Sequence, residues 1–282
     1  MPAKIFHSTL TGLPLAFGLA LLLAVSPARA DPEASGQGHG ASSPPAIHQG
    51  HKIVRETGNS CRTATPWCIV RFASDVTAGN ILILFVDTMT SKGINSVTDT
   101  CNSTWRREDS LIGSQFFHAF STTAACSGPE TITVNTNGSP DTEFQVLEVA
   151  GLTQTLDGIP VRNPATSVNT SDNPACEAIT TTNPSDLVLC AVGCQTPVPV
   201  IAGPSDDGPD ASQWVESVAD QKTVDTTIVA HEDESAVGSY GAQYRLGDIS
   251  SWTAITIAYK DSPATVTLPP APIATNTPAP EH

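Results

Sequence analysis

The chain has 282 residues, of which 28 are acidic and 13 are lysine or arginine, so its net charge is −15 at pH 7 with histidine neutral. Nucleic acids and anionic membrane surfaces attract proteins through basic patches, so this balance argues against both as partners. The acidity does not identify a partner, because acidic surfaces of exported proteins serve solubility as well as recognition.

The N-terminal segment Met1–Ala30 has the three parts of a secretory signal peptide. Lys4 gives a basic start, Gly12–Val25 is an apolar stretch, and Ala28-Arg29-Ala30 is a small-residue cleavage motif. The apolar stretch is short for a membrane span, which disfavours an uncleaved anchor. We therefore expect an exported chain, extracellular or periplasmic, that does not insert in a membrane after cleavage. Removal of the signal leaves 28 acidic against 11 basic residues.

Composition changes at both ends of the remaining chain. Residues 31–50 are mostly Gly, Ser, Pro, His and Ala, and residues 262–282 are rich in proline. The first stretch is predicted to be a disordered linker and the second an extended tail. The histidines His39, His48 and His51 fit a solvated linker better than a metal-binding one. Residues 51–261 remain for one β domain.

The centre of that domain is predicted to be the strand around Ile81–Val86. Six apolar residues run there without interruption between turn signals, which indicates a strand buried on both faces. Thr, Val and Ile dominate the other segments, and no 3.6-residue apolar period persists. Fourteen strands are predicted: His51–Glu56, Trp67–Ala73, Asn80–Asp87, Ile94–Asp99, Thr104–Asp109, Gln115–Ser121, Glu130–Thr136, Glu143–Ala150, Cys176–Thr182, Asp186–Gly193, Gln213–Val218, Thr223–His231, Val237–Arg245 and Ser251–Lys260.

Some of these strands alternate between two faces. In Ser251–Lys260, for example, Trp252 lies on one face and Ile255 on the other. A mixture of one-sided and two-sided burial predicts an all-β fold, a two-sheet antiparallel β-sandwich. The segments Ile159–Asn173 and Thr196–Ala211 are predicted to be long loops, where a site would be sought first.

Five phrases of the sequence, taken in order, resemble a jelly-roll-like β-sandwich domain that recurs in secreted bacterial proteins, mostly of unassigned function. They are Val76–Leu82, Ser96–Asp99 with Asn102 and Trp105, Val146–Leu152, Thr180–Val188 and Trp252–Lys260. The resemblance covers about His51 to Lys260. It implies the fold and transfers no catalytic residues, and the cysteines and the Pro-rich tail depart from the pattern.

All seven cysteines follow the signal, so in an exported protein they are predicted to form disulfides. Cys61 is expected to pair with Cys68 around a short loop, and Cys101 with Cys126 at the ends of two successive strands. Histidines do not stand at zinc-ligand spacing from the cysteines and Cys-x-x-Cys does not occur, so neither a metal site nor a cofactor is predicted.

Cys176 is expected to pair with Cys190 or Cys194, across a turn near Pro184. The arithmetic of the turn does not choose between them, and Cys190 is preferred because it lies inside the apolar strand. Cys194 would then remain at a fraying strand end, partly exposed and able to join two chains in a disulfide-linked dimer.

Pairs of carboxylates are candidate catalytic residues, because a glycosidase needs two of them on either side of the scissile bond. Glu143 and Glu148 are an odd number of residues apart and are predicted to lie on opposite faces, with a structural hydrogen-bonding role for Glu148. The acidic groups Glu232–Glu234 and Asp206–Asp210 lack the spacing of a calcium loop and are predicted to be solvated. His118 is predicted to be packed among aromatic side chains rather than to act as a general base.

A sugar-binding site would need aromatic side chains, and the chain has four tryptophans and three tyrosines. Trp105, beside Arg106 and after a polar turn, is the first candidate for ligand binding, and Trp214 after an acidic loop is the second. The favoured function is a secreted noncatalytic surface or glycan-binding module. The alternatives are a polysaccharide hydrolase or lyase on the same scaffold and a structural envelope or matrix protein.

Overall fold

The computed structural model describes residues 51–62, 65–88, 93–109, 117–138, 141–163, 169–205, 215–221, 226–233 and 236–263. The predicted signal peptide, the linker 31–50 and the chain beyond 263 lie outside the described residues. The described residues form eighteen strands and no helix, in antiparallel sheets. The all-β class predicted from the sequence is therefore confirmed. None of the described segments is a helix long and apolar enough to cross a membrane.

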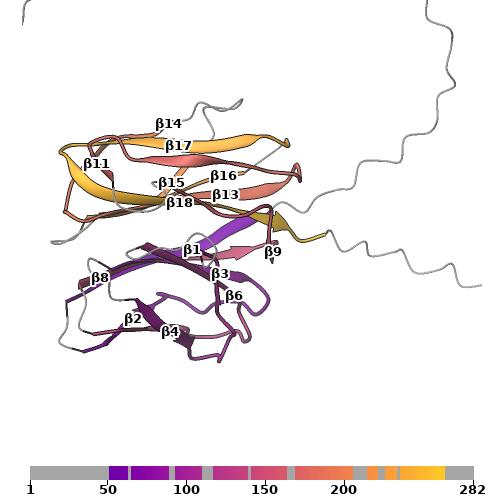
Figure 1. Ribbon diagram of the computed structural model, residues 1–282. Helices are drawn as coiled ribbons and strands as arrows, with labels where there is room; N and C mark the ends of the chain where they lie inside the picture. Colours follow the sequence, from indigo (N-terminus) through magenta and orange to yellow (C-terminus); the bar gives the residue numbers. More distant parts are fainter. Residues whose placement is uncertain are drawn as a thin grey trace, which may run out of the picture. The chain divides into compact units, whose positions relative to one another are not determined.

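The first eight strands form a two-sheet sandwich (Figure 1). We call the sheet with order β1-β8-β3-β6-β5 inner sheet 1 and the sheet with order β2-β7-β4 outer sheet 1. Strands 1, 8, 3 and 6 opposite strands 2, 7 and 4 are the arrangement of an eight-stranded jelly roll. The strands are β1 (Lys52–Arg62), β2 (Trp67–Arg71), β3 (Ile81–Thr88), β4 (Ile94–Asp99), β5 (Arg106–Arg107), β6 (Phe117–Thr123), β7 (Thr131–Thr136) and β8 (Asp141–Ala150).

The remaining strands repeat this connectivity. Inner sheet 2 has the order β10-β18-β13-β16-β15, and outer sheet 2 has the order β12-β17-β14. The edge position that β1 fills in the first repeat is shared by three short strands, β9, β10 and β11, which all pair with β18. The strands are β9 (Leu152–Leu156), β10 (Val161–Asn163), β11 (Asn169–Ser171), β12 (Ala175–Thr180), β13 (Asp186–Cys194), β14 (Val200–Ser205), β15 (Val215–Gln221), β16 (Thr226–Asp233), β17 (Ser239–Leu246) and β18 (Ser250–Asp261).

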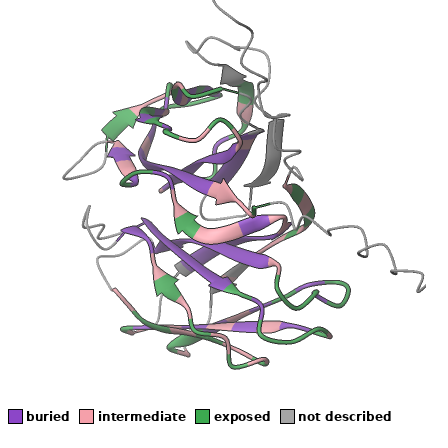
Figure 2. Ribbon diagram, turned by 90° about the vertical axis from the view of Figure 1, so that its right-hand side faces the viewer, coloured by how far each residue is buried: buried purple, intermediate pink, exposed green. Residues whose placement is uncertain are grey.

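The expected two-sheet sandwich is thus present twice, and the four sheets are joined by three layers of apolar side chains. Within each repeat, one layer fills the space between its inner and outer sheets. A third layer, with Ile83, Phe85, Leu189, Val229 and Ile257, joins the two inner sheets to each other. The strands in the middle of the stack are buried throughout, whereas those of outer sheet 1 alternate along their length (Figure 2).

The central strand behaves as its sequence predicts. All eight residues of β3 are buried, with Leu82 and Leu84 facing outer sheet 1 and Ile83 and Phe85 facing inner sheet 2. β13 is its counterpart in the second repeat and is also buried throughout. Each of these strands lies in the middle of a sheet that is covered on both sides, so neither has a polar face.

Two predicted loops contain strands that sequence reasoning missed. β10 and β11 lie within the expected loop 159–173, and β14 lies within the expected loop 196–211. β9 was also missed. These strands are short edge strands, so their apolar alternation is too brief to register as a pattern. By contrast, the expected strand Thr104–Asp109 shrinks to the two residues of β5.

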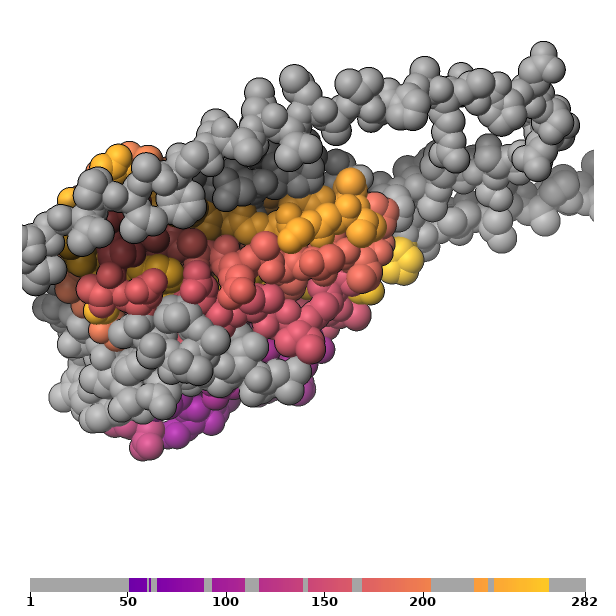
Figure 3. Space-filling view, turned by 45° about the horizontal axis from the view of Figure 1, so that its top comes forward, coloured from indigo at the N-terminus to yellow at the C-terminus, as the bar shows by residue number. Residues whose placement is uncertain are grey.

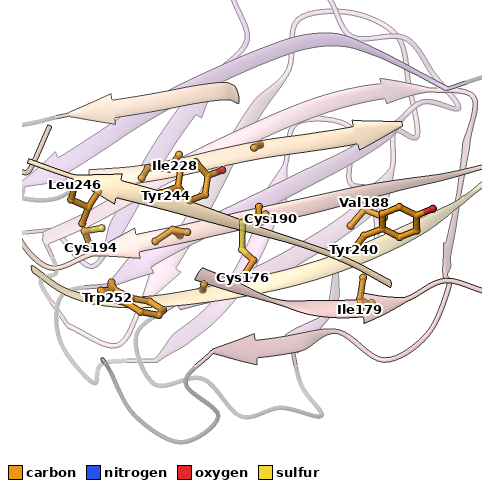
Figure 4. Close-up of a cluster of buried hydrophobic side chains, with 14 of the residues drawn as sticks. Cys176, Ile179, Val188, Cys190, Cys194, Ile228, Tyr240, Tyr244, Leu246 and Trp252 are labelled. Atoms are coloured by element: carbon orange, nitrogen blue, oxygen red, sulfur yellow. A yellow bond between two sulfur atoms is a disulfide. The ribbon is translucent and has the colours of Figure 1, made fainter. Parts of the chain in front are cut away.

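The predicted disulfides are present. Cys61 pairs with Cys68, Cys101 with Cys126, and Cys176 with Cys190. Figure 4 shows the Cys176–Cys190 bridge inside the apolar layer between the two sheets of the second repeat. The first bridge ties β1 to β2 and the third ties β12 to β13, in each case one strand of an inner sheet to one of an outer sheet. Cys101–Cys126 instead joins the connections that follow β4 and β6.

The expected exposure of Cys194 is wrong. Cys194 forms none of the three disulfides and is fully buried. The strand does not fray at Gly193, because β13 stays paired on both sides through its last residue, with Thr226 and with Trp252. A buried side chain in this layer is not placed to join two chains.

The two inner sheets come close together at Gly193, where Asp87 and Phe117 of inner sheet 1 occupy the space that a side chain would need. A Cβ atom added there would collide with the carboxylate of Asp87 and lie 2.9 Å from the ring of Phe117. Gly193→Ala should therefore force the sheets apart and destabilise the fold by about 1–3 kcal/mol, measured by urea unfolding. Gly93→Ala is the control, because a Cβ there meets nothing within 4 Å. Equal stability of the two variants would contradict the close packing.

Thiol labelling tests the cysteine assignment. In the folded, unreduced protein, Cys194 should resist alkylation because it is buried. After denaturation without a reductant, mass spectrometry should find a single labelled cysteine, and peptide mapping should place it at Cys194. A thiol that reacts rapidly in the native state, or a second labelled cysteine, would refute the assignment.

Candidate functional site

Two of the three residues predicted to bind a ligand, Trp105 and Arg106, form contacts within the protein at the edge strand β5. The indole Nε1 of Trp105 donates to the carboxylate of Asp99 at 2.9 Å, and the ring packs half-buried against the core. Arg106 forms hydrogen bonds with both carboxylate oxygens of Glu108 and donates to the carbonyl of Gln154. Trp214 lies outside the described residues. Ligand binding by these side chains stays a prediction.

A pocket of about 310 Å³ lies beside β5, between the first repeat and the connection from β9 to β10. Arg106, Arg107 and Glu108 line one side, and Ile159 and Pro160 lie among the residues that line the other. Glu108 is buried and accepts a hydrogen bond from the hydroxyl of Ser121. The charges of the pocket are thus largely compensated within the protein.

Behind this pocket, His118 and Asp109 form a buried acid–base pair. Nδ1 of His118 lies 3.1 Å from Asp109 and 2.8 Å from the guanidinium of Arg107. Burial alone would raise the pKa of Asp109, but the hydrogen bonds and positive charges of His118 and Arg107 outweigh it and lower this pKa. The predicted burial of His118 beside Phe120 is confirmed, while its ionic partners were missed. Both side chains are sealed from solvent, so the arrangement pins β5 against β6.

Two more carboxylates, Asp87 and Glu143, face each other across β3 and β8 at the junction of the inner sheets. Each is only 1% exposed. Thr227 of inner sheet 2 donates to Glu143, and Asp87 lies against Gly193. A glycosidase needs two carboxylates on either side of a bound sugar. Closed sheets leave no room for a sugar between these two.

Glu148 has the structural role predicted for it. It lies on the opposite face of β8 from Glu143, as expected, and its carboxylate accepts hydrogen bonds from the backbone of Thr77 and the amide of Asn80 and pairs with Arg55. The carboxylate therefore fixes the turn before β3 against β1. Glu232, predicted to be solvated, is instead buried in β16. Asp206–Asp210 lie outside the described residues.

Asp157 and Asp186 form a second carboxyl pair, at the turn that follows β12. Asp157 accepts hydrogen bonds from the backbone N–H groups of Thr182 and Asn183 and lies 3.2 Å from Nζ of Lys260. Burial, and then the hydrogen bond to Asp157 and its negative charge, raise the pKa of Asp186 to about 7. For Asp157 burial acts in the same direction, but the hydrogen bonds from Asp186, Thr182 and Asn183 outweigh it and lower the pKa. The two carboxyls therefore share one proton in the neutral range.

Among the described residues, one group of side chains lies close enough together to be considered as metal ligands. It consists of Cys101, Cys126 and Glu130. The two sulfurs are joined in a disulfide, so they offer no thiolate to a metal. Glu130 already accepts hydrogen bonds from the backbone and hydroxyl of Thr100.

An open surface on outer sheet 1 was not singled out by sequence reasoning. Along β2, Cys68 and Val70 point inward, whereas Trp67, Ile69 and Arg71 point outward. Trp67 is 46% exposed and is the only exposed aromatic side chain among the described residues. The sequence of β2 does not alternate in polarity, because Ile69 is as apolar as Cys68 and Val70, so the period-2 pattern that marks a half-buried strand is absent here.

The outward residues form rows across outer sheet 1. Trp67 lies opposite Asn135, which lies opposite Ser96 on β4. The next row contains Ile69, Thr133 and Thr98. The amide of Asn135 donates to the hydroxyl of Ser96 at 3.0 Å. The face therefore combines one indole with amide and hydroxyl groups. We call it the Trp67 face.

The indole is carried on an immobilised backbone. The N–H of Thr136 donates to the carbonyl of Pro66 at 2.8 Å, immediately before Trp67. Immediately after it, Cys68 is tied to β1 by a disulfide. Pre-organisation of this kind lowers the entropy lost when a ligand binds.

A groove of about 400 Å³ opens beside the Trp67 face, between the edges of β1 and β2. Its lining consists of Thr57, Gly58, Asn59, Ile69, Val70 and Arg71. The side-chain amide of Asn59 donates to the carbonyl of Ile69 at 2.8 Å and so bridges the two strands. The lining contains no carboxylate.

Comparison of the chain with family models, curated proteins and solved structures gives no match.

The stability of the fold should fall as the pH rises toward the pKa of Asp186. Because this pKa is raised to about 7, the native protein keeps a proton that the unfolded chain releases near pH 4. This contribution is complete below about pH 4 and is lost as the pH rises through about 7, a change on the order of 1–3 kcal/mol. Urea unfolding across this range measures it.

Asp186→Asn is the matched variant for this experiment. Its amide can donate to Asp157 and accept from Asn183 without ionising. The variant should lose the decline in stability between about pH 4 and 7 that is due to Asp186. An unchanged pH profile would mean that the two carboxyls do not share a proton.

Proposed function

We propose that the protein is a secreted, noncatalytic glycan-binding module and that the Trp67 face is its binding surface. The observation that carries the proposal is the exposed indole of Trp67 on a strand that is paired with β7 and tied to β1 by a disulfide. Aromatic rings bind the C–H faces of sugars because they are large, apolar and rigid, and neighbouring amides and hydroxyls satisfy the sugar hydroxyls. Asn135, Ser96 and Thr133 provide such groups beside the ring.

Export is supported by the signal-like segment Met1–Ala30 and by the three disulfides. Disulfides persist in oxidising compartments and are rare where thiols are kept reduced. The resemblance of the ordered part to jelly-roll-like domains of secreted bacterial proteins agrees with this location. Cys61–Cys68 also stiffens the strand that carries Trp67, so the oxidising environment would serve the proposed site directly.

The carboxylate geometry favours binding over hydrolysis. Neither described pocket is lined by two carboxylates: the groove beside the Trp67 face has none, and the pocket beside β5 has Glu108 alone. The paired carboxylates Asp87 and Glu143 are sealed between the inner sheets. A hydrolase or lyase on this scaffold would need such a pair at a surface that a polysaccharide can reach.

The described residues of the second repeat offer no exposed aromatic side chain. On β17 the large aromatic side chains Tyr240 and Tyr244 point inward and are 1% exposed. The outward positions of that strand are Ser239, Gly241, Gln243 and Arg245. Figure 3 shows the salmon and orange surface of this repeat. The proposed function therefore belongs to the first repeat, and the second supports it through the inner sheets.

Trp67→Ala should abolish or strongly reduce glycan binding without unfolding the protein. Loss of one stacking side chain at the centre of such a site lowers affinity by about ten-fold or more. The measurement is binding of the mature protein to a glycan array, followed by titration with the best ligand. Ile201→Ala is the control, since Ile201 is 57% exposed on β14 of the other repeat. Full binding by the Trp67 variant would exclude the Trp67 face as the site.

A further inference from the structure

We propose that the ligand of the Trp67 face is a uronic-acid polysaccharide, which runs along β2 and places a carboxylate against Arg71 in the groove between β1 and β2. This inference rests on the proposed function and adds the chemical class of the ligand. Four features of the described residues support it: the spacing along β2, the state of Arg71, the lining of the groove and the local charge.

The first feature is the distance between the two ends of the surface. Trp67 and Arg71 point to the same side of β2 and are four residues apart. Strands rise by about 3.3 Å per residue, so these side chains start about 13 Å from each other. A single sugar ring cannot reach from one to the other. A ligand that uses both must be a chain of several sugars.

The second feature is the availability of Arg71. Arg55, Arg106 and Arg107 are each held by a carboxylate of the protein. Arg71 is exposed at the end of β2, and within the described part of the chain it forms no ion pair. A guanidinium binds a planar carboxylate through two parallel hydrogen bonds. Arg71 is therefore a ready partner for one carboxylate of a ligand.

The third feature is the groove itself. It places the hydroxyl of Thr57 and the amide of Asn59 beside Arg71. The amide nitrogen of Asn59 donates to the carbonyl of Ile69 and fixes the width of the groove there, while the hydroxyl of Thr57 is of the kind that binds a sugar hydroxyl. These groups suit a sugar that carries one carboxylate and several hydroxyls. A sulfated chain, with more charge per sugar, would require more cations than this groove provides.

The fourth feature is the local charge. The groove lining contains Arg71 and no carboxylate, although the chain as a whole is strongly acidic. Salt screens exposed charges that are more than about 10 Å apart at 0.1 M ionic strength, so the more distant acidic residues weigh less there. An anionic group in the groove therefore meets the charge of Arg71 with no carboxylate among the lining residues.

The experiment compares polysaccharides that differ only in their carboxylates. Polygalacturonate, alginate and hyaluronan are each titrated into the mature protein beside their carboxyl-reduced, neutral counterparts, with dextran sulfate as the sulfated probe. At least one uronate chain should bind ten-fold or more tightly than its neutral counterpart, and added salt should weaken it. Arg71→Gln should remove this difference, whereas Trp67→Ala should weaken both forms.

Arg245→Gln is the matched control. Arg245 is exposed on β17 of the second repeat, with no ion pair in the described part of the chain, and its loss should leave the preference unchanged. Equal binding of charged and neutral chains, with dependence on Trp67, would overturn the acidic ligand and keep the glycan-binding function. Preference for dextran sulfate would also overturn the uronate assignment. Absence of binding to every glycan would overturn both proposals.

Discussion

The two inner sheets depend on being buried against each other. β3 and β13 present apolar side chains on both faces, so neither inner sheet can face water on its second side. Burial of apolar area contributes about 25 cal/mol per Å², and the layer between the inner sheets contains the stacked rings of Phe85 and Phe117. Gly193 allows the carboxylate of Asp87 to fit at the end of this layer. The two repeats therefore stabilise each other as one folding unit.

The two repeats share a strand order but differ in what they place on it. Ile81 of β3 pairs with Val149, and Leu187 of β13 pairs with Tyr259, at equivalent points of the two inner sheets. The side chains of Ile81 and Leu187 both point into the apolar layer between the two inner sheets. The outer sheets differ: the first carries an exposed tryptophan on β2, while the described aromatic residues of β17 are turned inward. A common scaffold with a site on one face is consistent with function being local to a site rather than to a fold.

Much of the scaffold could be predicted from local pattern. The burial of the run Ile81–Val86 and the alternation in β18 follow from period. The spacing around the turn left Cys190 and Cys194 both open as partners of Cys176, and the position of Cys190 inside the apolar strand decided the preference that the structure confirms. The repeat did not, because equivalent strands share only burial and not residue identity. Cys194 was misplaced since the pairing of β13 with β16 and β18 is a long-range property. Sequence reasoning favoured Trp105 over Trp67 for its polar surroundings, yet Asp99 uses that polarity to anchor the ring.

Binding of a glycan along β2 is tested most directly by titrating a uronate oligosaccharide into the isotope-labelled mature protein and following the amide and indole N–H resonances. We expect the shifts to concentrate on the indole of Trp67 and on the backbone of β2 and of β1 near Asn59. Shifts that cluster instead around Arg106 and Ile159, with those of β2 unchanged, would contradict it.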